Sequence, residues 1–198
     1  MSERPETTLF LGPETSPLAE WLESVEPSFL QTEQNIDAEF IDENEIGLLV
    51  SYGYRHILKQ PLLEKLPGRA VNLHISLLPW NRGADPNLWS FLDDTPKGVT
   101  IHYLDEGIDT GDIIAQRRIE FSDPEHETLA TTYGQLDTLI QALFRESWQS
   151  IKDGSCERSR QSGAGSYHTT ADRAAVAALL TDGWDTPVVR LLSRRASR

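Results

Sequence analysis

The chain contains three short apolar runs. Residues 8–11 form one run, which ends at Gly12, residues 46–52 form a longer run, which ends at Gly53, and residues 70–74 form the third. Continuous apolar runs of this length are typical of parallel strands that are buried on both faces. Each run is therefore predicted to be a strand of a buried sheet.

Helical periodicity begins directly after the first run. Ser16 is a good N-cap, and Pro17 suits the first helical position. The apolar positions that follow recur at i, i+3, i+4 and i+7 and are Leu18, Trp21, Leu22 and Val25. This spacing predicts an amphipathic helix. A second helix is predicted over residues 85–92, where Pro86 takes the first position.

Two further strands are predicted in the middle of the chain. Val99, Ile101 and Tyr103 alternate with the residues between them, which is strand periodicity. After a loop over residues 105–112, the chain is predicted to return as a strand over 113–121. Residues 28–45 are polar and carry no clear period, so at most one short strand is expected there.

The last third of the chain is predicted to be helical. A long helix is expected over residues 129–151, because its large apolar residues fall on one side. A short helix is expected over residues 171–180, with Thr169 or Thr170 as its cap and Gly183 as its stop.

Alternating strands and helices favour an α/β fold with a mostly parallel central sheet and helices on both faces. Residues 154–168 are small and polar and include Gly163 and Gly165, so they are predicted to be a surface linker. The expected organisation is a catalytic domain over 1–153, this linker, and a short C-terminal extension over 169–198.

Charge is distributed unevenly along the 198 residues. The net charge is −13, and residues 158–198 carry seven Arg against three Asp, which leaves residues 1–157 at −17. An acidic body repels phosphate backbones, so a nucleic-acid partner is not favoured. The plainer interpretation, a solvated acidic surface, stays open. The arginines near the end, among them Arg190 and Arg194, leave open a contact with the acidic body or with a second subunit, and hence a homodimer.

Cys156 is the one cysteine, which excludes a disulfide framework and a multi-cysteine metal site, and no metal is expected. No window holds the roughly 18 consecutive apolar residues that a membrane helix needs. The first six residues are charged and lack the apolar stretch of a signal peptide. The expectation is a cytoplasmic protein with no membrane partner.

The most informative polar residues lie at the third apolar run. Asn72 and His74 stand two residues apart in the segment N-L-H-I-S-L-L-P, and Asp109 lies later in the segment D-E-G-I-D-T-G-D. Residues two apart on a strand project from the same side. An amide can donate to a developing oxyanion, and an imidazole can take a proton near neutral pH. Each residue alone has an ordinary explanation, as a turn former or a surface residue.

Together, these two blocks resemble the signature of the folate-dependent formyltransferases. That superfamily includes methionyl-tRNA formyltransferase, glycinamide ribonucleotide formyltransferase and the sugar N-formyltransferases. The resemblance spans roughly residues 46–121 and implies a Rossmann-like formyltransferase fold, in a compact single-domain member. It also implies that Asn72, His74 and Asp109 are the catalytic trio, with His74 oriented by the carboxylate of Asp109.

The resemblance further implies that 10-formyltetrahydrofolate is the formyl donor and co-substrate. Residues 51–58 match the segment that binds the pterin in the family, and residues 105–109 match the opposite wall of that pocket. The residues carried over as folate contacts are Tyr54, His56, Leu58, Asp105 and Glu106. Core packing remains an alternative role for Tyr54.

The acceptor is the part of the reaction that varies across the superfamily. The acidic body and the absence of an expected C-terminal barrel domain disfavour methionyl-tRNA, and Glu14 stands where glycinamide ribonucleotide would place its phosphate. Ser76, Trp80 and Arg82 resemble the acceptor side of the sugar N-formyltransferases. We therefore expect a small-molecule primary amine, on an amino sugar that is nucleotide-linked. The alternatives are the two other acceptors, hydrolysis of the formyl-folate, and a non-catalytic ligand-binding module.

Overall fold

The computed structural model describes residues 6–193. Six strands form the central sheet, in the order β2-β1-β3-β4-β6-β7. Strands β2, β1, β3 and β4 run parallel, whereas β6 is antiparallel to both β4 and β7. The strands are β1 (Thr7–Leu11), β2 (Phe29–Thr32), β3 (Ile46–Ser51), β4 (Ala70–His74), β6 (Gly98–Tyr103) and β7 (Ile113–Arg118). A second sheet pairs β5 (Arg82–Gly83) with β8 (Tyr167–His168).

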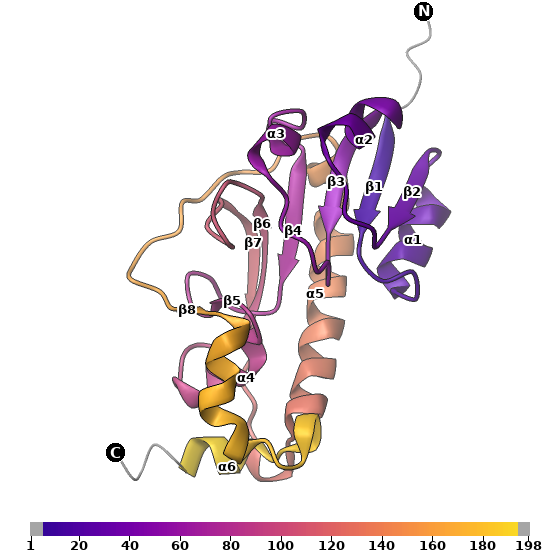
Figure 1. Ribbon diagram of the computed structural model, residues 1–198. Helices are drawn as coiled ribbons and strands as arrows, with labels where there is room; N and C mark the ends of the chain where they lie inside the picture. Colours follow the sequence, from indigo (N-terminus) through magenta and orange to yellow (C-terminus); the bar gives the residue numbers. More distant parts are fainter. Residues whose placement is uncertain (1–5, 194–198) are drawn as a thin grey trace, which may run out of the picture.

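Helices cover both faces of the central sheet (Figure 1). The apolar sides of α1 and α5 pack on one face, and α2 and α3 pack on the other. The α-helices are α1 (Pro17–Val25), α2 (Ala38–Glu43), α3 (Gln60–Leu63), α4 (Pro86–Leu92), α5 (Leu129–Lys152) and α6 (Val188–Ser193), and the 3-10 helices are η1 (Pro124–His126), η2 (Thr170–Leu179) and η3 (Gly183–Asp185). The predicted α/β class with a mostly parallel sheet is confirmed.

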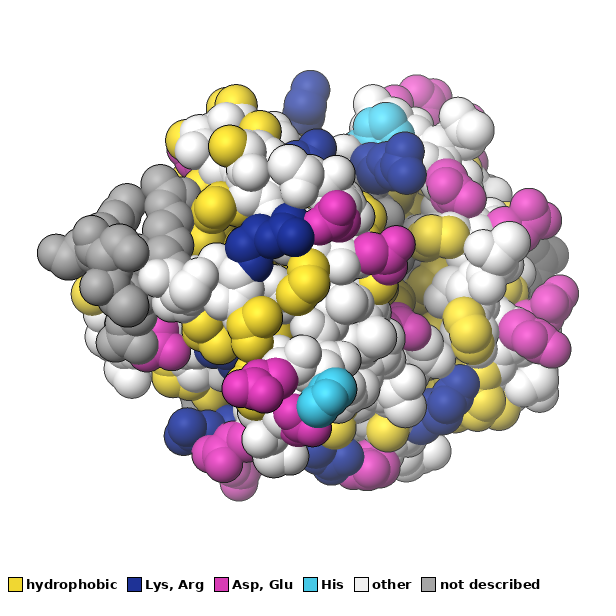
Figure 2. Space-filling model, turned by 90° about the horizontal axis from the view of Figure 1, so that it is seen from below, with side chains coloured by type: hydrophobic (Ala, Val, Ile, Leu, Met, Phe, Trp, Pro, Cys, Tyr) yellow, Lys and Arg dark blue, Asp and Glu magenta, His cyan; other side chains and the backbone are white. Residues whose placement is uncertain are grey.

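The parallel strands all end at the lower edge of the sheet in Figure 1, and α4, α6 and η3 lie beyond that edge. Open α/β sheets bind ligands outside the carboxyl ends of their strands. Seen from this edge, the surface is hollowed, and its Lys and Arg side chains lie apart from one another among acidic ones (Figure 2). Among the described residues of this face, the basic side chains do not form a continuous patch (Figure 2).

Most of the predicted elements are present, with several differences. Helix α2 was not predicted, because only Ile41 of its six residues is buried and its polar sequence shows little period. Helix α3 and the two-residue strands β5 and β8 were also not predicted. Strand β7 ends at Arg118 rather than at residue 121. The short helix expected over residues 171–180 is a 3-10 helix, with Thr169 as its cap.

None of the helices within residues 6–193 is long and apolar enough to cross a membrane. Of the arginines near the end, Arg190 is described, and it pairs with Asp182 at 2.7 Å. The charged residues 1–5 and the arginines at 194, 195 and 198 lie outside the described residues. The division into a catalytic domain, a linker and an extension stays a prediction.

Candidate active site

Strand β4 presents Asn72 and His74 on one face of the sheet. Its other side chains, Val71 and Leu73, belong to the core under α1 and α5, so the alternation of the strand turns the two polar residues toward the opposite face. Strand β6 pairs with β4 and places His102 directly opposite Asn72. Three of the four polar groups of the site therefore come from two adjacent strands in the middle of the sheet.

Asp109 reaches this face from the loop between β6 and β7. The loop is held by Asp105, whose Oδ1 accepts from the N–H of Gly107 at 3.1 Å and from the hydroxyl of Thr110 at 2.7 Å. Asp109 adopts a left-handed backbone with φ of 53°. At Gly111 a Cβ would lie 1.8 Å from the carbonyl oxygen of Tyr103. Only glycine allows the loop to approach β6 this closely.

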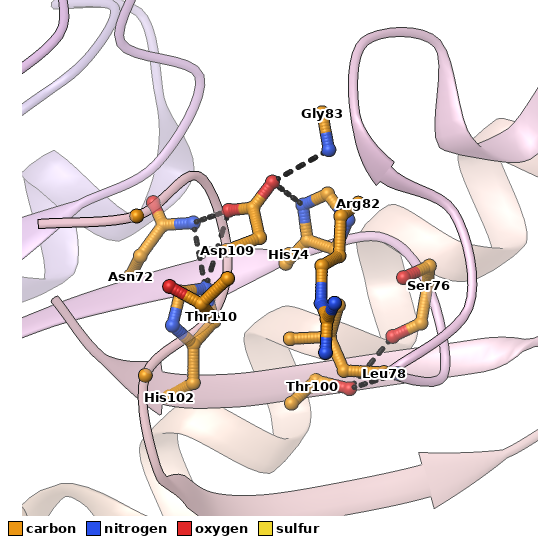
Figure 3. Close-up of polar contacts among 12 residues, drawn as sticks. Asn72, His74, Ser76, Leu78, Arg82, Gly83, Thr100, His102, Asp109 and Thr110 are labelled. Atoms are coloured by element: carbon orange, nitrogen blue, oxygen red, sulfur yellow. Dashed lines mark hydrogen bonds and ion pairs between the residues drawn. The ribbon is translucent and has the colours of Figure 1, made fainter. Parts of the chain in front are cut away.

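The carboxylate of Asp109 lies at the centre of the cluster (Figure 3). Oδ1 accepts from Nδ2 of Asn72 at 3.3 Å and lies 3.3 Å from Nε2 of His102. Oδ2 accepts from the N–H of Gly83 at 2.8 Å and lies 3.5 Å from Nδ1 of His74. Each oxygen thus faces one imidazole and one N–H donor.

The second nitrogen of each imidazole faces a backbone carbonyl. Nδ1 of His102 lies 2.8 Å from the carbonyl oxygen of Tyr103 and therefore donates to it. Nε2 of the neutral ring is then an acceptor, and it receives a hydrogen from Nδ2 of Asn72 at 3.2 Å. The amide of Asn72 consequently directs one hydrogen to His102 and the other to Asp109.

His74 lies between two acceptors. Its Nε2 is 2.9 Å from the carbonyl oxygen of Asn81, and its Nδ1 faces the Asp109 carboxylate. A neutral imidazole has one N–H and can satisfy only one of these neighbours, whereas a protonated ring satisfies both. The surroundings of His74 are therefore arranged to receive a proton.

Burial and charge act in opposite directions on the two titrating groups. Burial of His74 lowers its pKa below the ordinary histidine value, and this outweighs the attraction of Asp109. For Asp109, burial opposes ionisation, but the interactions with His74 and His102 and the N–H of Gly83 together hold the pKa well below the ordinary range. The cluster is therefore an ionised carboxylate beside an imidazole that is neutral at neutral pH and can act as a base.

The predicted folate residues lie beside the same face. Tyr54, Leu58 and Leu104 all pack against the core cluster under α2 and α3, and Leu104 directly precedes Asp105. The hydroxyl of Tyr54 donates to the carbonyl of Gln34 at 2.6 Å, and its ring meets that of His56 edge-on. His56, Asp105 and Glu106 are exposed. The structure thus brings both predicted walls to one side of the sheet.

The predicted acceptor residues differ in their surroundings. Ser76 is buried, and its hydroxyl donates to the carbonyl of Trp80 at 2.7 Å, so it holds the loop after β4. Trp80 is partly exposed. Arg82 donates through Nε and Nη2 to Oε1 of Gln161, at 3.0 and 2.7 Å. Their roles toward a substrate stay predictions.

A cavity of about 490 Å³ lies where β4 leaves the sheet, between the beginnings of α4 and α5 and next to η3. Ile75, the residue after His74, forms part of its wall. Most of the lining is apolar, and Tyr133 and Trp184 supply half-exposed aromatic rings. The lining residues are Ile75, Asp85, Pro86, Asn87, Leu88, Leu129, Ala130, Tyr133 and Trp184.

Three residues of the site were not predicted. His102 is among them, although the alternation that predicted β6 places it on the same face as Thr100, and that signal was available. Asn81 contacts the site through its backbone carbonyl, seven residues after His74, and Gln161 through residues distant in sequence. No local pattern predicts such contacts.

A doubly wound sheet that presents an amide, two imidazoles and a carboxylate beside the end of a parallel strand defines an α/β protein with an acid–base site. A family model described as formyl transferase matches residues 15–145, which include Asn72, His74, His102 and Asp109. The chain belongs to the formyl transferase family, as the resemblance implied.

Three relatives illustrate the range of acceptors in the family. A crystal structure of the formyltransferase PseJ from Anoxybacillus kamchatkensis, in complex with UDP-4,6-dideoxy-4-formamido-L-AltNAc and tetrahydrofolate, is 49% identical with a TM-score of 0.88 and covers 93% of this chain and 97% of that chain. Methionyl-tRNA formyltransferase of Acetivibrio thermocellus is 35% identical over 138 residues, 69% of this chain and 43% of that protein. Phosphoribosylglycinamide formyltransferase of Bacillus subtilis is 42% identical over 89 residues, 44% of this chain and 45% of that protein. The chain therefore spans less than half the length of these two curated relatives.

Proposed function

We propose that this protein transfers a formyl group from 10-formyltetrahydrofolate to the primary amine of a nucleotide-linked amino sugar. The observation that carries the proposal is the likeness to PseJ, which extends over nearly the whole of both chains and whose complex holds a UDP-linked formamido sugar and tetrahydrofolate. The arrangement of Asn72, His74 and Asp109 supports it, because each has the chemistry that formyl transfer to an amine requires.

The reaction needs a neutral amine, a place for negative charge on the formyl oxygen and an acceptor for one proton. Asn72 directs an N–H of its amide to the oxyanion that develops when the amine attacks, and one such donor contributes about 3–4 kcal/mol. For this, Nδ2 gives up its hydrogen bond to Asp109 or to His102. The proton that leaves the amine goes to the His74–Asp109 pair, where the protonated imidazole lies between Asp109 and the carbonyl of Asn81. When the bond between the formyl carbon and the folate nitrogen breaks, this proton is returned to that nitrogen, and tetrahydrofolate leaves.

10-Formyltetrahydrofolate supplies an activated formyl group when it is bound. The residues proposed to hold it are Tyr54, His56 and Leu58 on one side and Asp105 and Glu106 on the other. The apolar surface of Tyr54, Leu58 and Leu104 beside polar loop atoms suits a flat amino-pteridine ring, which combines an apolar face with a polar edge.

The cavity between α4 and α5 is the proposed place of the nucleotide part of the acceptor. Its volume of about 490 Å³ is within the range of small-molecule sites. Trp184 and Tyr133 offer rings for stacking. The proposed cation for the diphosphate is Arg173, whose guanidinium lies 5.9 Å from the ring of Trp184 and 3.4 Å from Oδ2 of Asp85. Trp80 and Arg82 remain the proposed contacts for the sugar.

Binding measurements separate this function from its alternatives. We expect calorimetry to detect binding of 5-formyltetrahydrofolate, a stable mimic of the donor, and a UDP-linked 4-amino sugar to tighten that binding. If glycinamide ribonucleotide or methionyl-tRNA tightened the binding of 5-formyltetrahydrofolate instead, that compound would be the acceptor. Release of formate from 10-formyltetrahydrofolate without any amine would indicate a hydrolase. Failure of every folate to bind would leave a ligand-binding module and contradict the proposal.

A further inference from the structure

Residues 159–168, here called the strap, run along the outside of the molecule between the end of α5 and β8 (Figure 1). Their small polar sequence predicted a surface linker. The structure joins them to the segments that carry the polar cluster. Ser159 exchanges two backbone hydrogen bonds with Ile113, at 2.7 and 3.0 Å, and β8 pairs with β5.

Gln161 makes four hydrogen bonds with a single side chain. Its Nε2 donates to the backbone carbonyls of Asp109 at 2.8 Å and of Gly111 at 2.9 Å. Its Oε1 accepts from Nε and Nη2 of Arg82. Because the guanidinium of Arg82 has only donors, it fixes the amide with its NH2 toward the loop.

These bonds close a ring of contacts around the carboxylate. Arg82 precedes Gly83, whose N–H donates to Oδ2 of Asp109. Gln161 therefore connects the backbone of Asp109 to the strand that holds its side chain. Within the loop, Thr110 bonds to Asp105, and the two carbonyls that Gln161 holds lie on either side of Thr110.

The strap also supports His74 from the opposite side. The hydroxyl of Ser166 accepts from the N–H of Asn81 at 2.8 Å and donates to its Oδ1 at 3.0 Å. The carbonyl of the same Asn81 faces Nε2 of His74. At Gly165 a Cβ would lie 2.3 Å from the carbonyl oxygen of Pro79, so this approach requires glycine.

We propose that Gln161 is a positioning residue that holds the Asp109 carboxylate between His74 and His102, which makes the strap part of the catalytic centre. The inference rests on the proposed formyl transfer, but Gln161 itself is not among the proposed substrate contacts. Displacement of a catalytic group by about 1 Å can cost roughly 100-fold in rate. Gln161 should therefore affect turnover and leave binding of the folate unchanged.

Two substitutions separate positioning from mere attachment of the strap. Gln161→Met keeps the length of the side chain and removes all four hydrogen bonds. Gln161→Glu keeps an acceptor for Arg82 and removes both donors to the Asp109 loop. The neighbouring Arg160→Ala is the control, because Arg160 is exposed. Steady-state kinetics for both substrates, as a function of pH, are measured for each variant, with circular dichroism to confirm folding.

Gln161→Met is expected to lower kcat by roughly 10- to 100-fold with little change in KM for the folate. The acid limb of its pH–rate profile should move to lower pH. Asp109 raises the pKa of His74, whereas burial and His102 lower it, so a displaced carboxylate leaves His74 with a lower pKa. Gln161→Glu should be impaired in kcat as well. Recovery of wild-type kcat in Gln161→Glu would show that only the attachment to Arg82 matters and would overturn the proposal, as would an unmoved acid limb in Gln161→Met.

Titration of the histidine rings by NMR gives a readout that needs no turnover. In Gln161→Met the ring of His74 should titrate at lower pH than in the wild type, and in Arg160→Ala it should not move. If the wild-type protein transferred no formyl group, this shift would still test the positioning role, so the failure of one proposal is distinguishable from the failure of the other. An unchanged His74 titration in a folded Gln161→Met protein would refute the inference.

Discussion

Replacement of Asp109 by Asn removes the charge of the cluster and leaves its shape. The side-chain oxygen of the introduced asparagine can still accept from the N–H of Gly83, and its NH2 faces Nε2 of His102, which can accept from it in place of Asn72. Asn also tolerates the left-handed backbone at this position better than most residues. The variant is therefore expected to fold.

The expected loss of activity in this variant follows from the distance between His74 and the carboxylate. Unit charges 3.5 Å apart interact by about 4–5 kcal/mol at an effective dielectric constant of about 20. The imidazole acquires only part of its charge in the transition state, so part of this energy is lost. Since each ~1.4 kcal/mol is tenfold in rate, kcat/KM should fall by roughly 100- to 1000-fold.

The assay is the initial rate of formylated sugar formation at saturating donor and varied acceptor, with thermal unfolding as the check on folding. Retention of kcat/KM within about threefold of the wild type in a folded Asp109→Asn protein would refute the electrostatic role of the carboxylate. Loss of activity that tracked loss of folded protein would likewise not support it.

Three further outcomes are expected. The base form of His74 is the active one, and burial lowers its pKa, so log kcat/KM should fall with slope near one below an apparent pKa that lies under the ordinary histidine value. An apparent pKa above that value would contradict the assignment of His74 as the base. Gly83→Ala places a Cβ 2.2 Å from the carbonyl oxygen of His168, at φ of 85°, and should lower both the melting temperature and the activity. In the control variant Gly134→Ala, the added Cβ has no neighbour within 4 Å, so the activity should be unchanged and the melting temperature no lower. Trp184→Ala should raise KM for the sugar nucleotide about tenfold by loss of stacking and leave KM for the folate unchanged; an effect on the folate alone would exclude the cavity as the nucleotide site.

The periodicity of the chain predicted what depends on local pattern. The apolar run of β4 placed Asn72 and His74 on one face, and the cap at Ser16 with Pro17 placed the start of α1. The same reasoning could have included His102, because the alternation of β6 turns it to the face of Thr100. His102 was not recognised as a site residue, because the hydrophobic periodicity of a strand shows which face a residue is on but not which strand lies beside it.

Residues that act through distant contacts could not be predicted in this way. Gln161 lies 52 positions from Asp109 and 79 from Arg82, and its polar, glycine-containing surroundings are typical of a linker. The hydroxyl of Ser76 donates to the carbonyl of Trp80, which the motif did not reveal, and its predicted contact with the substrate stays a prediction. For Gln161, the tertiary partners determine the role.

Formyl transfer by the Asn72–His74–Asp109 cluster is tested most directly by product analysis. The purified protein is incubated with 10-formyltetrahydrofolate and the UDP-linked 4-amino sugar that corresponds to the formamido sugar bound by PseJ, and the sugar product is identified by mass spectrometry. A His74→Gln variant serves as the matched control. We predict a formamido sugar that depends on donor, acceptor and the imidazole of His74. The proposed function would be contradicted if the amino sugar stayed unmodified with all components present, or if His74→Gln formed as much product as the wild type.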